Sequence, residues 1–235
     1  MASAPVFASN TPEWVKRGLV IAHPGKFPVE YLGQMDTDPP QYAVLVAGEL
    51  FVMFDGTKGP DFHTAQLLEH ARFQPGERVL EVGTGIGPIA VFAARAGAKV
   101  IATDIDPVAV ANTRHNAERL GVSHLLDVRE GDLFAPVRGE NLFDVILFNV
   151  IYPYNDKTLH HWQLHERFFA EVGQYLAPGG RIYYQAGYLD NLPQIRSMVA
   201  NNNLVIDEMH LMSVPQYRRQ PMVFVIRPKS AWNSP

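Results

Sequence analysis

Strand-like and helix-like segments alternate along most of this chain, and the alternation restricts the fold more than any other feature of the sequence. Short apolar runs that predict strands cover residues 78–83, 99–104, 125–132, 143–149 and 181–188. Segments with helical spacing cover residues 88–97, 107–121, 159–176 and 192–202. This order predicts a mostly parallel sheet with helices packed on both faces.

The end of the chain departs from the alternation. Two apolar runs, LVIDEMHLM (204–212) and PMVFVIR (221–227), are separated by only eight residues and no helix. So short a connection suits a hairpin, whose strands are antiparallel. The fold-class prediction is therefore an α/β fold: a doubly wound, seven-stranded, mostly parallel sheet with an antiparallel C-terminal hairpin.

The first 60 residues follow a different pattern. TPEWVKRGL (11–19) predicts a short helix, and QYAVLVAGELFVMFDG (41–56) predicts two strands. An amphipathic helix, DFHTAQLLEHARF (61–73), then leads into the first strand of the main sheet. We therefore expect an N-terminal extension over residues 1–60, packed on a main domain over residues 61–235.

The composition excludes several classes of protein. The 235 residues include no cysteine, which rules out disulfides, thiolate metal sites and a cysteine nucleophile. A net charge of −4 argues mildly against a protein whose main task is to bind a phosphate backbone. The N-terminus lacks the basic and apolar regions of a signal peptide, and no apolar run approaches the length of a membrane span. We expect a cytoplasmic protein without membrane contact.

A glycine-rich segment, Glu81-Val-Gly83-Thr-Gly85-Ile-Gly87, lies between a predicted strand and a predicted helix. Glycines there let the backbone approach a ligand, which also meets the positive end of the helix dipole. Asp104 ends the next strand, where doubly wound folds place a carboxylate against ribose hydroxyls. The spacing differs from the G-x-G-x-x-G of dinucleotide sites, and the Glu81 carboxylate would repel a pyrophosphate. That carboxylate suits a ligand with an ammonium group and a cationic sulfur, such as S-adenosylmethionine (SAM).

The stretch VLEVGTGIG (79–87), followed by ATDIDP (102–107) and EGDLF (130–134), resembles the class I SAM-dependent methyltransferases. The resemblance implies that the glycine loop contacts the methionine and ribose parts of SAM, whose product is S-adenosylhomocysteine. It also implies that acids after the second and third strands bind the ribose hydroxyls and the adenine amine. The implied cofactor-binding residues are Glu81, Gly83, Thr84, Gly85, Gly87, Asp104, Ile105, Asp132, Leu133 and Asn149.

The stretch FDVILFNVIY (143–152) carries a second resemblance. Methyltransferases that act on amide or amine nitrogen often end the fourth strand with Asn-Pro-Pro-Tyr, and Asn149 and Tyr152 stand at the matching positions. The flanking sequence is most similar to the release-factor glutamine methyltransferases, which also have a strand pair and a helix before the glycine loop. The resemblance implies catalytic roles for Asn149 and Tyr152, and substrate contacts for Tyr152 and Tyr154. An alternative register places the motif at residues 151–154.

Val150 and Ile151 replace the two prolines of that motif. Prolines would stiffen the loop so that a backbone carbonyl and the Asn149 side-chain oxygen accept hydrogen bonds from the substrate nitrogen. This departure argues against glutamine or adenine as the acceptor. Because the sequence shows no separate recognition domain and its net charge is slightly negative, we favour methyl transfer to a nitrogen or other heteroatom of a small molecule. A protein glutamine or a nucleic-acid base is the alternative acceptor, and a SAM-binding protein without transfer activity is an alternative of another class. A homo-oligomer is compatible with each.

Three histidines in the predicted helix over residues 159–176 have a spacing that metal ligands can have. His161 and His165 are four residues apart and share one helix face. Such pairs are more often ordinary surface residues, and we expect no metal site. Phe62 and Thr64, which precede the glycine loop, are further candidates for contact with the cofactor.

Overall fold

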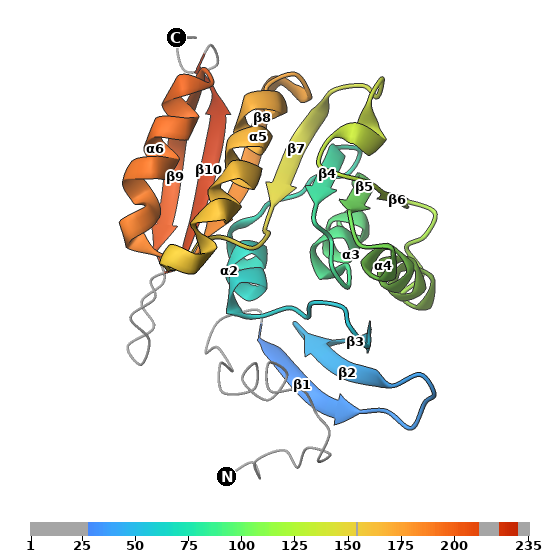
Figure 1. The fold of residues 1–235 in the computed structure, drawn as a ribbon. Helices are drawn as coiled ribbons and strands as arrows, with labels where there is room; N and C mark the ends of the chain where they lie inside the picture. Colours follow the sequence, from blue (N-terminus) through green and yellow to red (C-terminus); the bar gives the residue numbers. More distant parts are fainter. Residues whose placement is uncertain (1–27, 154, 212–220, 230–235) are drawn as a thin grey trace.

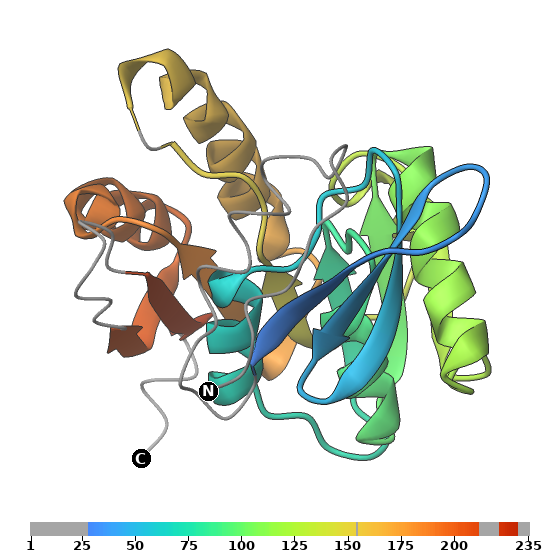
Figure 2. The same ribbon diagram turned by 90° about the horizontal axis from the view of Figure 1, so that it is seen from below.

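The computed structural model describes residues 28–153, 155–211 and 221–229, which form two sheets with helices packed around the larger one (Figures 1 and 2). The predicted helix over residues 11–19 and the connection over residues 213–220 lie outside the described residues. No helix of the described part is both long and apolar enough to cross a membrane.

The larger sheet has seven strands in the order β6-β5-β4-β7-β8-β10-β9. Their bounds are β4 (Arg78–Val82), β5 (Lys99–Asp104), β6 (Leu126–Glu130), β7 (Phe143–Phe148), β8 (Leu176–Ala186), β9 (Leu204–Leu211) and β10 (Met222–Pro228). The first five strands in this spatial order pair in parallel, and β10 pairs antiparallel with both β8 and β9. The predicted fold class is confirmed, including the antiparallel pair of strands at the C-terminus.

Helices cover both faces of this sheet and give it two separate cores. The helices of the described part are α2 (Phe62–His70), α3 (Pro88–Arg95), α4 (Pro107–Arg119), α5 (Trp162–Val172) and α6 (Leu192–Asn201), with 3₁₀ turns η1 (Ala135–Val137), η2 (Asp156–His161) and η3 (Leu189–Asn191). Val79 and Val145 belong to the core with α2, α3 and α4. Leu80 and Ile146, one residue further along each strand, belong to the core with α5 and α6. Burial on both faces explains why these strands are continuous apolar runs.

Strand β8 begins earlier than the sequence predicts. Residues 159–176 were expected to be one helix, but the chain forms η2 and α5 and enters β8 at Leu176. Leu176 is buried and pairs with Phe143 of β7, with a register shift before the next pairs. The Ala-Pro-Gly-Gly sequence that follows resembles a turn, but pairing with β7 makes it part of a long, irregular strand. Tertiary pairing here overrides the local turn preference.

The N-terminal segment forms a separate three-stranded antiparallel sheet, β1-β2-β3, with bounds Val29–Gln34, Gln41–Val46 and Glu49–Phe54. Only β2 and β3 were predicted. Strand β1 is as long as β2 and β3, but its alternation of buried and exposed residues ends at Leu32, where the register shifts between Tyr31 and Gly33. The Tyr31 hydroxyl donates to the carbonyl of Pro60 at 2.7 Å, which ties this sheet to the segment before α2.

Two buried asparagines of α4 join the small sheet to the main domain. Asn116 accepts from the backbone N–H of Val52 at 2.9 Å and donates to the carbonyls of Val52 and Ile86, at 2.8 and 2.9 Å. Asn112 accepts from the N–H of Phe54 and donates to the Val52 carbonyl. These side chains form hydrogen bonds with the backbone N–H and C=O groups at the outer edge of β3. Without them those groups would be buried and unpaired.

Replacing Asn116 with alanine is expected to lower the free energy of unfolding by about 2–4 kcal/mol, because it strands the buried N–H of Val52 and the carbonyl of Ile86. Urea denaturation measures the change. Glu118→Ala, at an exposed position of the same helix, is the matched control and should stay within about 0.5 kcal/mol of the wild type. Equal effects of the two substitutions would contradict this account of the interface.

Candidate functional site

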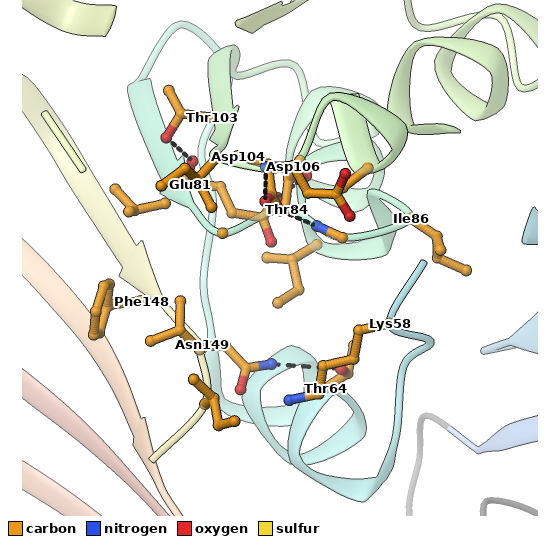
Figure 3. Close-up of a pocket in the computed structure, with 18 of the residues that line it drawn as sticks. Lys58, Thr64, Glu81, Thr84, Ile86, Thr103, Asp104, Asp106, Phe148 and Asn149 are labelled. Carbon is orange, nitrogen blue, oxygen red and sulfur yellow. Dashed lines mark hydrogen bonds between the residues drawn. The ribbon is translucent and has the colours of Figure 1, made fainter. Parts of the chain in front are cut away.

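A cavity of about 760 Å³ lies where β4, β5 and β7 end, between the main sheet and the segment that leads into α2. Its lining includes all but two of the predicted site residues: Glu81, Gly83, Thr84, Gly85, Asp104, Ile105, Asp132, Leu133, Asn149 and Tyr152. Gly87 is the N-cap of α3 and does not line it, and Tyr154 lies outside the described residues. Figure 3 shows Glu81, Thr84 and Asp104 gathered on one side and Asn149 with Thr64 on another.

The loop after β4 needs glycine for two separate reasons. Gly83 and Gly85 have φ angles of +82° and +58°, in the left-handed region that favours glycine. A Cβ at Gly83 would also lie 2.5 Å from Cγ1 of Val150, in the loop after β7. The two loops are therefore in direct contact.

Glu81 is an almost fully buried carboxyl group at the start of this loop. Its Oε2 accepts hydrogen bonds from the Thr84 hydroxyl and from the backbone N–H of Ala90 in α3, each at 3.0 Å. Burial raises the pKa of Glu81 to about 8, and the nearby Asp104 charge adds to this, although both hydrogen bonds act to lower the pKa. Among the described residues no lysine, arginine or histidine forms a salt bridge with it.

Asp104 shapes the loop as well as lining the cavity. Its two carboxylate oxygens accept from the backbone N–H groups of Gly85 at 2.9 Å and Asp106 at 3.0 Å. Ile105 beside it is a large apolar side chain that is 69% exposed. Asp132 forms an ion pair with Arg167 at 2.6 Å, on the surface. Its carboxylate therefore already has one partner, and its predicted contact with adenine stays a prediction.

Asn149 and Tyr152 are each held by a residue of the first turn of α2. The Asn149 amide nitrogen donates to the Thr64 hydroxyl at 3.4 Å, which orients its Oδ1 away from Thr64 (Figure 3). The Tyr152 hydroxyl lies 2.5 Å from Nε2 of His63. The Tyr152 ring covers Gly187, where no side chain could be accommodated. Consecutive residues of α2 thus position the two ends of the Asn-x-x-Tyr motif.

The loop between these two residues is held by a buried histidine rather than by prolines. His165 was expected on the surface, and this is wrong: it is completely buried. Its Nε2 donates to the carbonyl of Ile151 at 2.9 Å, and its Nδ1 accepts from the Tyr184 hydroxyl at 2.7 Å. Burial lowers the pKa of His165 to about 4, so the imidazole is neutral at pH 7 and this pattern of one donor and one acceptor persists.

The cavity lining also includes residues that no sequence pattern had indicated, among them Lys58, Asp61 and His63. Asp61 is the N-cap of α2, and its side chain accepts from the backbone N–H of His63. A helix-capping Asp followed two residues later by His, at the start of the helix that precedes β4, was the available signal. Of the two residues suggested there, Thr64 lines the cavity, whereas Phe62 packs on the His63 ring.

Comparison with known proteins finds that the family described as "Methyltransferase small domain" matches residues 52–206. A ribosomal protein L11 methyltransferase of Exiguobacterium sp. is 34% identical over 116 residues, covering 49% of this chain and 36% of that protein. A release factor glutamine methyltransferase of Cereibacter sphaeroides is 41% identical over 107 residues, covering 46% and 38%. The matches thus span less than two fifths of either relative's length.

Solved structures share the fold at low sequence identity. A ribosomal protein L11 methylase of Lactobacillus delbrueckii subsp. bulgaricus has a TM-score of 0.60 at 24% identity, covering 75% of this chain and 84% of that one. A SAM-dependent methyltransferase of Thiobacillus denitrificans, solved with S-adenosylhomocysteine, has a TM-score of 0.52 at 16% identity, covering 72% and 92%.

The buried Glu81 makes stability depend on pH. Because its pKa rises from 4.5 in the unfolded chain to about 8 in the folded one, the folded state holds a proton between these values that the unfolded state has lost. The free energy of unfolding should therefore fall as pH rises from about 4.5 to about 8, by on the order of a few kcal/mol. Urea denaturation of the wild type and Glu81→Gln across this range isolates the effect, since glutamine keeps the acceptor oxygen without the titration. A stability difference that does not change with pH would contradict it.

Proposed function

This chain belongs to the methyltransferase small domain family, and from that membership we propose that its cavity binds SAM and transfers the methyl group to a nitrogen of a protein. The predicted enzyme class, a SAM-dependent methyltransferase, is confirmed by the family. The observation that carries the site assignment is that one cavity contains both the glycine loop and the Asn-x-x-Tyr loop, in direct contact with each other.

The residues present fit SAM. The cavity volume is within the range of sites for ligands of this size, roughly 300–1,000 Å³. Glu81 offers a buried carboxyl group to the ammonium group of the ligand, and loss of its proton on binding would leave a paired charge rather than an isolated one. Asp104 ends β5, where ribose hydroxyls can donate to it. Ile105 offers an exposed apolar side chain to the flat face of adenine. Bound SAM would supply an electrophilic methyl group on a sulfonium centre, whose carbon–sulfur bond breaks with the electron pair left on sulfur.

On the acceptor side, Asn149 has the central role. Thr64 binds its amide nitrogen, so its Oδ1 is available to accept a hydrogen bond from the N–H of the acceptor. This hydrogen bond points the nitrogen lone pair in a defined direction, and positioning accounts for much of the catalysis of an in-line displacement. The same bond strengthens as positive charge develops on the nitrogen.

A protein acceptor is better supported than the small molecule favoured from the sequence. The relatives named above are methyltransferases of ribosomal protein L11 and of release factors. The cavity wall formed by Lys58, Asp61 and His63 comes from the segment that joins the small sheet to α2 and from the first turn of α2.

SAM binding is tested by isothermal titration calorimetry. We expect binding by the wild type, and a roughly 10- to 100-fold weaker affinity for Gly83→Ala, because the added Cβ meets Val150 in a strained backbone conformation. Gly139→Ala is the matched control: its φ is the same +82°, but the added Cβ has nothing within 4 Å. The proposal would be overturned if titration to roughly 100 µM SAM gave no heat of binding. A dissociation constant of that size corresponds to a binding free energy of about −5.5 kcal/mol.

Acceptor class is tested by incubating the protein with SAM carrying a tritiated methyl group and a fractionated cell extract. We expect label in the protein fraction, and at least a 100-fold lower rate for Asn149→Ala with SAM affinity within a few-fold of the wild type. Asn201→Ala, on the surface of α6, should change neither. Label in nucleic acid or small molecules would replace the proposed acceptor, and SAM binding without transfer would favour a silent binding protein.

A further inference from the structure

Three polar side chains form a continuous chain on the acceptor side of the cavity. Asp61 Oδ2 lies 3.0 Å from Nδ1 of His63, and the Tyr152 hydroxyl lies 2.5 Å from Nε2 of the same ring. All three residues line the cavity that also contains Asn149. The His63 side chain is only 5% exposed, whereas Asp61 is 35% exposed. Asp61 thus connects a buried imidazole to the protein surface.

The hydrogen-bond geometry indicates where one proton of this chain lies. Desolvation alone would raise the pKa of Asp61, but the charge and two hydrogen bonds of His63, with the nearby Lys58, hold that pKa well below its usual range. Asp61 is therefore a carboxylate, which can only accept. Nδ1 of His63 must then carry a proton to bind Asp61; when the ring carries only that proton, Nε2 is an acceptor and the Tyr152 hydroxyl donates to it.

The surroundings hold this arrangement in place. The Phe62 ring packs on His63 at 4.0 Å between centroids, and the Tyr188 ring packs edge-on against Tyr152 at 5.8 Å. The backbone N–H of His63 also donates to Asp61 at 2.9 Å, which fixes the carboxylate relative to the ring. The titratable and charged groups that face this chain from neighbouring elements are Lys58, Tyr31 and His161.

The chain also lies beside the residue that would orient the acceptor. His63 holds Tyr152, and the next residue, Thr64, holds Asn149. The first turn of α2 therefore holds both ends of the motif. At one end His63 can take a proton from Tyr152, and at the other end Thr64 leaves the Asn149 oxygen available to accept from the N–H of the substrate. An aromatic side chain that only stacked on a substrate would not need a buried histidine on its hydroxyl.

Resting on the proposed methyl transfer, we propose that Asp61, His63 and Tyr152 form a proton relay that deprotonates the acceptor nitrogen. The N–H bond of the acceptor breaks, its electron pair stays on nitrogen, and the proton passes to the Tyr152 oxygen. The proton of that hydroxyl passes in turn to Nε2 of His63. The Asp61 carboxylate stabilises the resulting imidazolium. Because Asp61 is partly exposed, solvent can take up the extra proton there. His63 and Asp61 act through Tyr152 and are positioning residues in this scheme, while Tyr152 touches the substrate.

The kinetic test uses transfer of tritiated methyl from SAM to the protein fraction of the extract. Tyr152→Phe keeps the ring over Gly187, and we expect it to lower the rate about 10²- to 10³-fold. His63→Gln should lower the rate similarly and remove the acid limb of the pH–rate profile. The double variant, Tyr152→Phe with His63→Gln, should be no slower than either single variant, because the residues act as a unit.

His124→Gln, at an exposed position, is the control. A rate for Tyr152→Phe within threefold of the wild type, or an unchanged acid limb in His63→Gln, overturns the relay.

A second readout does not depend on turnover. Nitrogen NMR of histidine-labelled protein should show His63 with its proton on Nδ1. Asp61→Asn should move that proton to Nε2, because asparagine still caps α2 but presents an N–H to the ring. A proton on Nε2 in the wild type overturns the relay even if SAM binds and label is transferred. Absence of SAM binding and of label transfer, with the Nδ1 proton in place, instead overturns the proposed function and the relay's part in it.

Discussion

The parallel pairing of β4 with β7 decides where a site can form in this protein. Val82 pairs with Phe148, so the residues that follow, Gly83 and Asn149, leave the sheet at the same edge although 65 positions separate them in the chain. The backbone of Gly83 then lies against Val150 with no room for a side chain. A glycine loop that suits SAM and a loop that suits an acceptor nitrogen are therefore two walls of one cavity. The helices pack on the two faces of the sheet, and the small sheet lies beyond the ends of β4 and β7 (Figure 1).

Buried histidines take over work that prolines do in the Asn-Pro-Pro-Tyr motif. A proline restricts its own φ angle, whereas His165 restrains the loop from outside by binding the carbonyl of Ile151. The hydrogen bond from Tyr184 and the surrounding core keep His165 neutral and oriented. His63 acts at the other end of the motif through the hydroxyl of Tyr152. The loop of Val150 and Ile151 is thus held by contacts that a local reading of four residues does not reveal.

Much of the fold and of the cavity lining could be predicted, because both depend on patterns that are local in sequence. Alternating strands and helices predicted the parallel sheet, and the missing helix before the last strand predicted its antiparallel end. Gly83 and Gly85 of the glycine loop, with Asp104 at the end of β5 and Asp132 after β6, line one cavity, and their contacts with a cofactor stay predictions. Strand β1 and the start of β8 were missed because pairing partners, rather than local preference, create them. His63 and His165 could not be assigned from spacing, since each acquires its role from a residue far away along the chain.

By itself the sequence determined the fold class, the family and the identity of the residues at the ends of the central strands. These follow from hydrophobic periodicity and from the few residue types that a tight turn or a helix start will accept, and both act over short distances along the chain. The tertiary structure alone decided the ionisation of Glu81, the burial of His165 and the connection from Asp61 through His63 to Tyr152. Protonation, burial and hydrogen bonding depend on which groups surround an atom in space. Those neighbours come from α2, α3, α5 and the loop after β7, and only the folded chain brings them together.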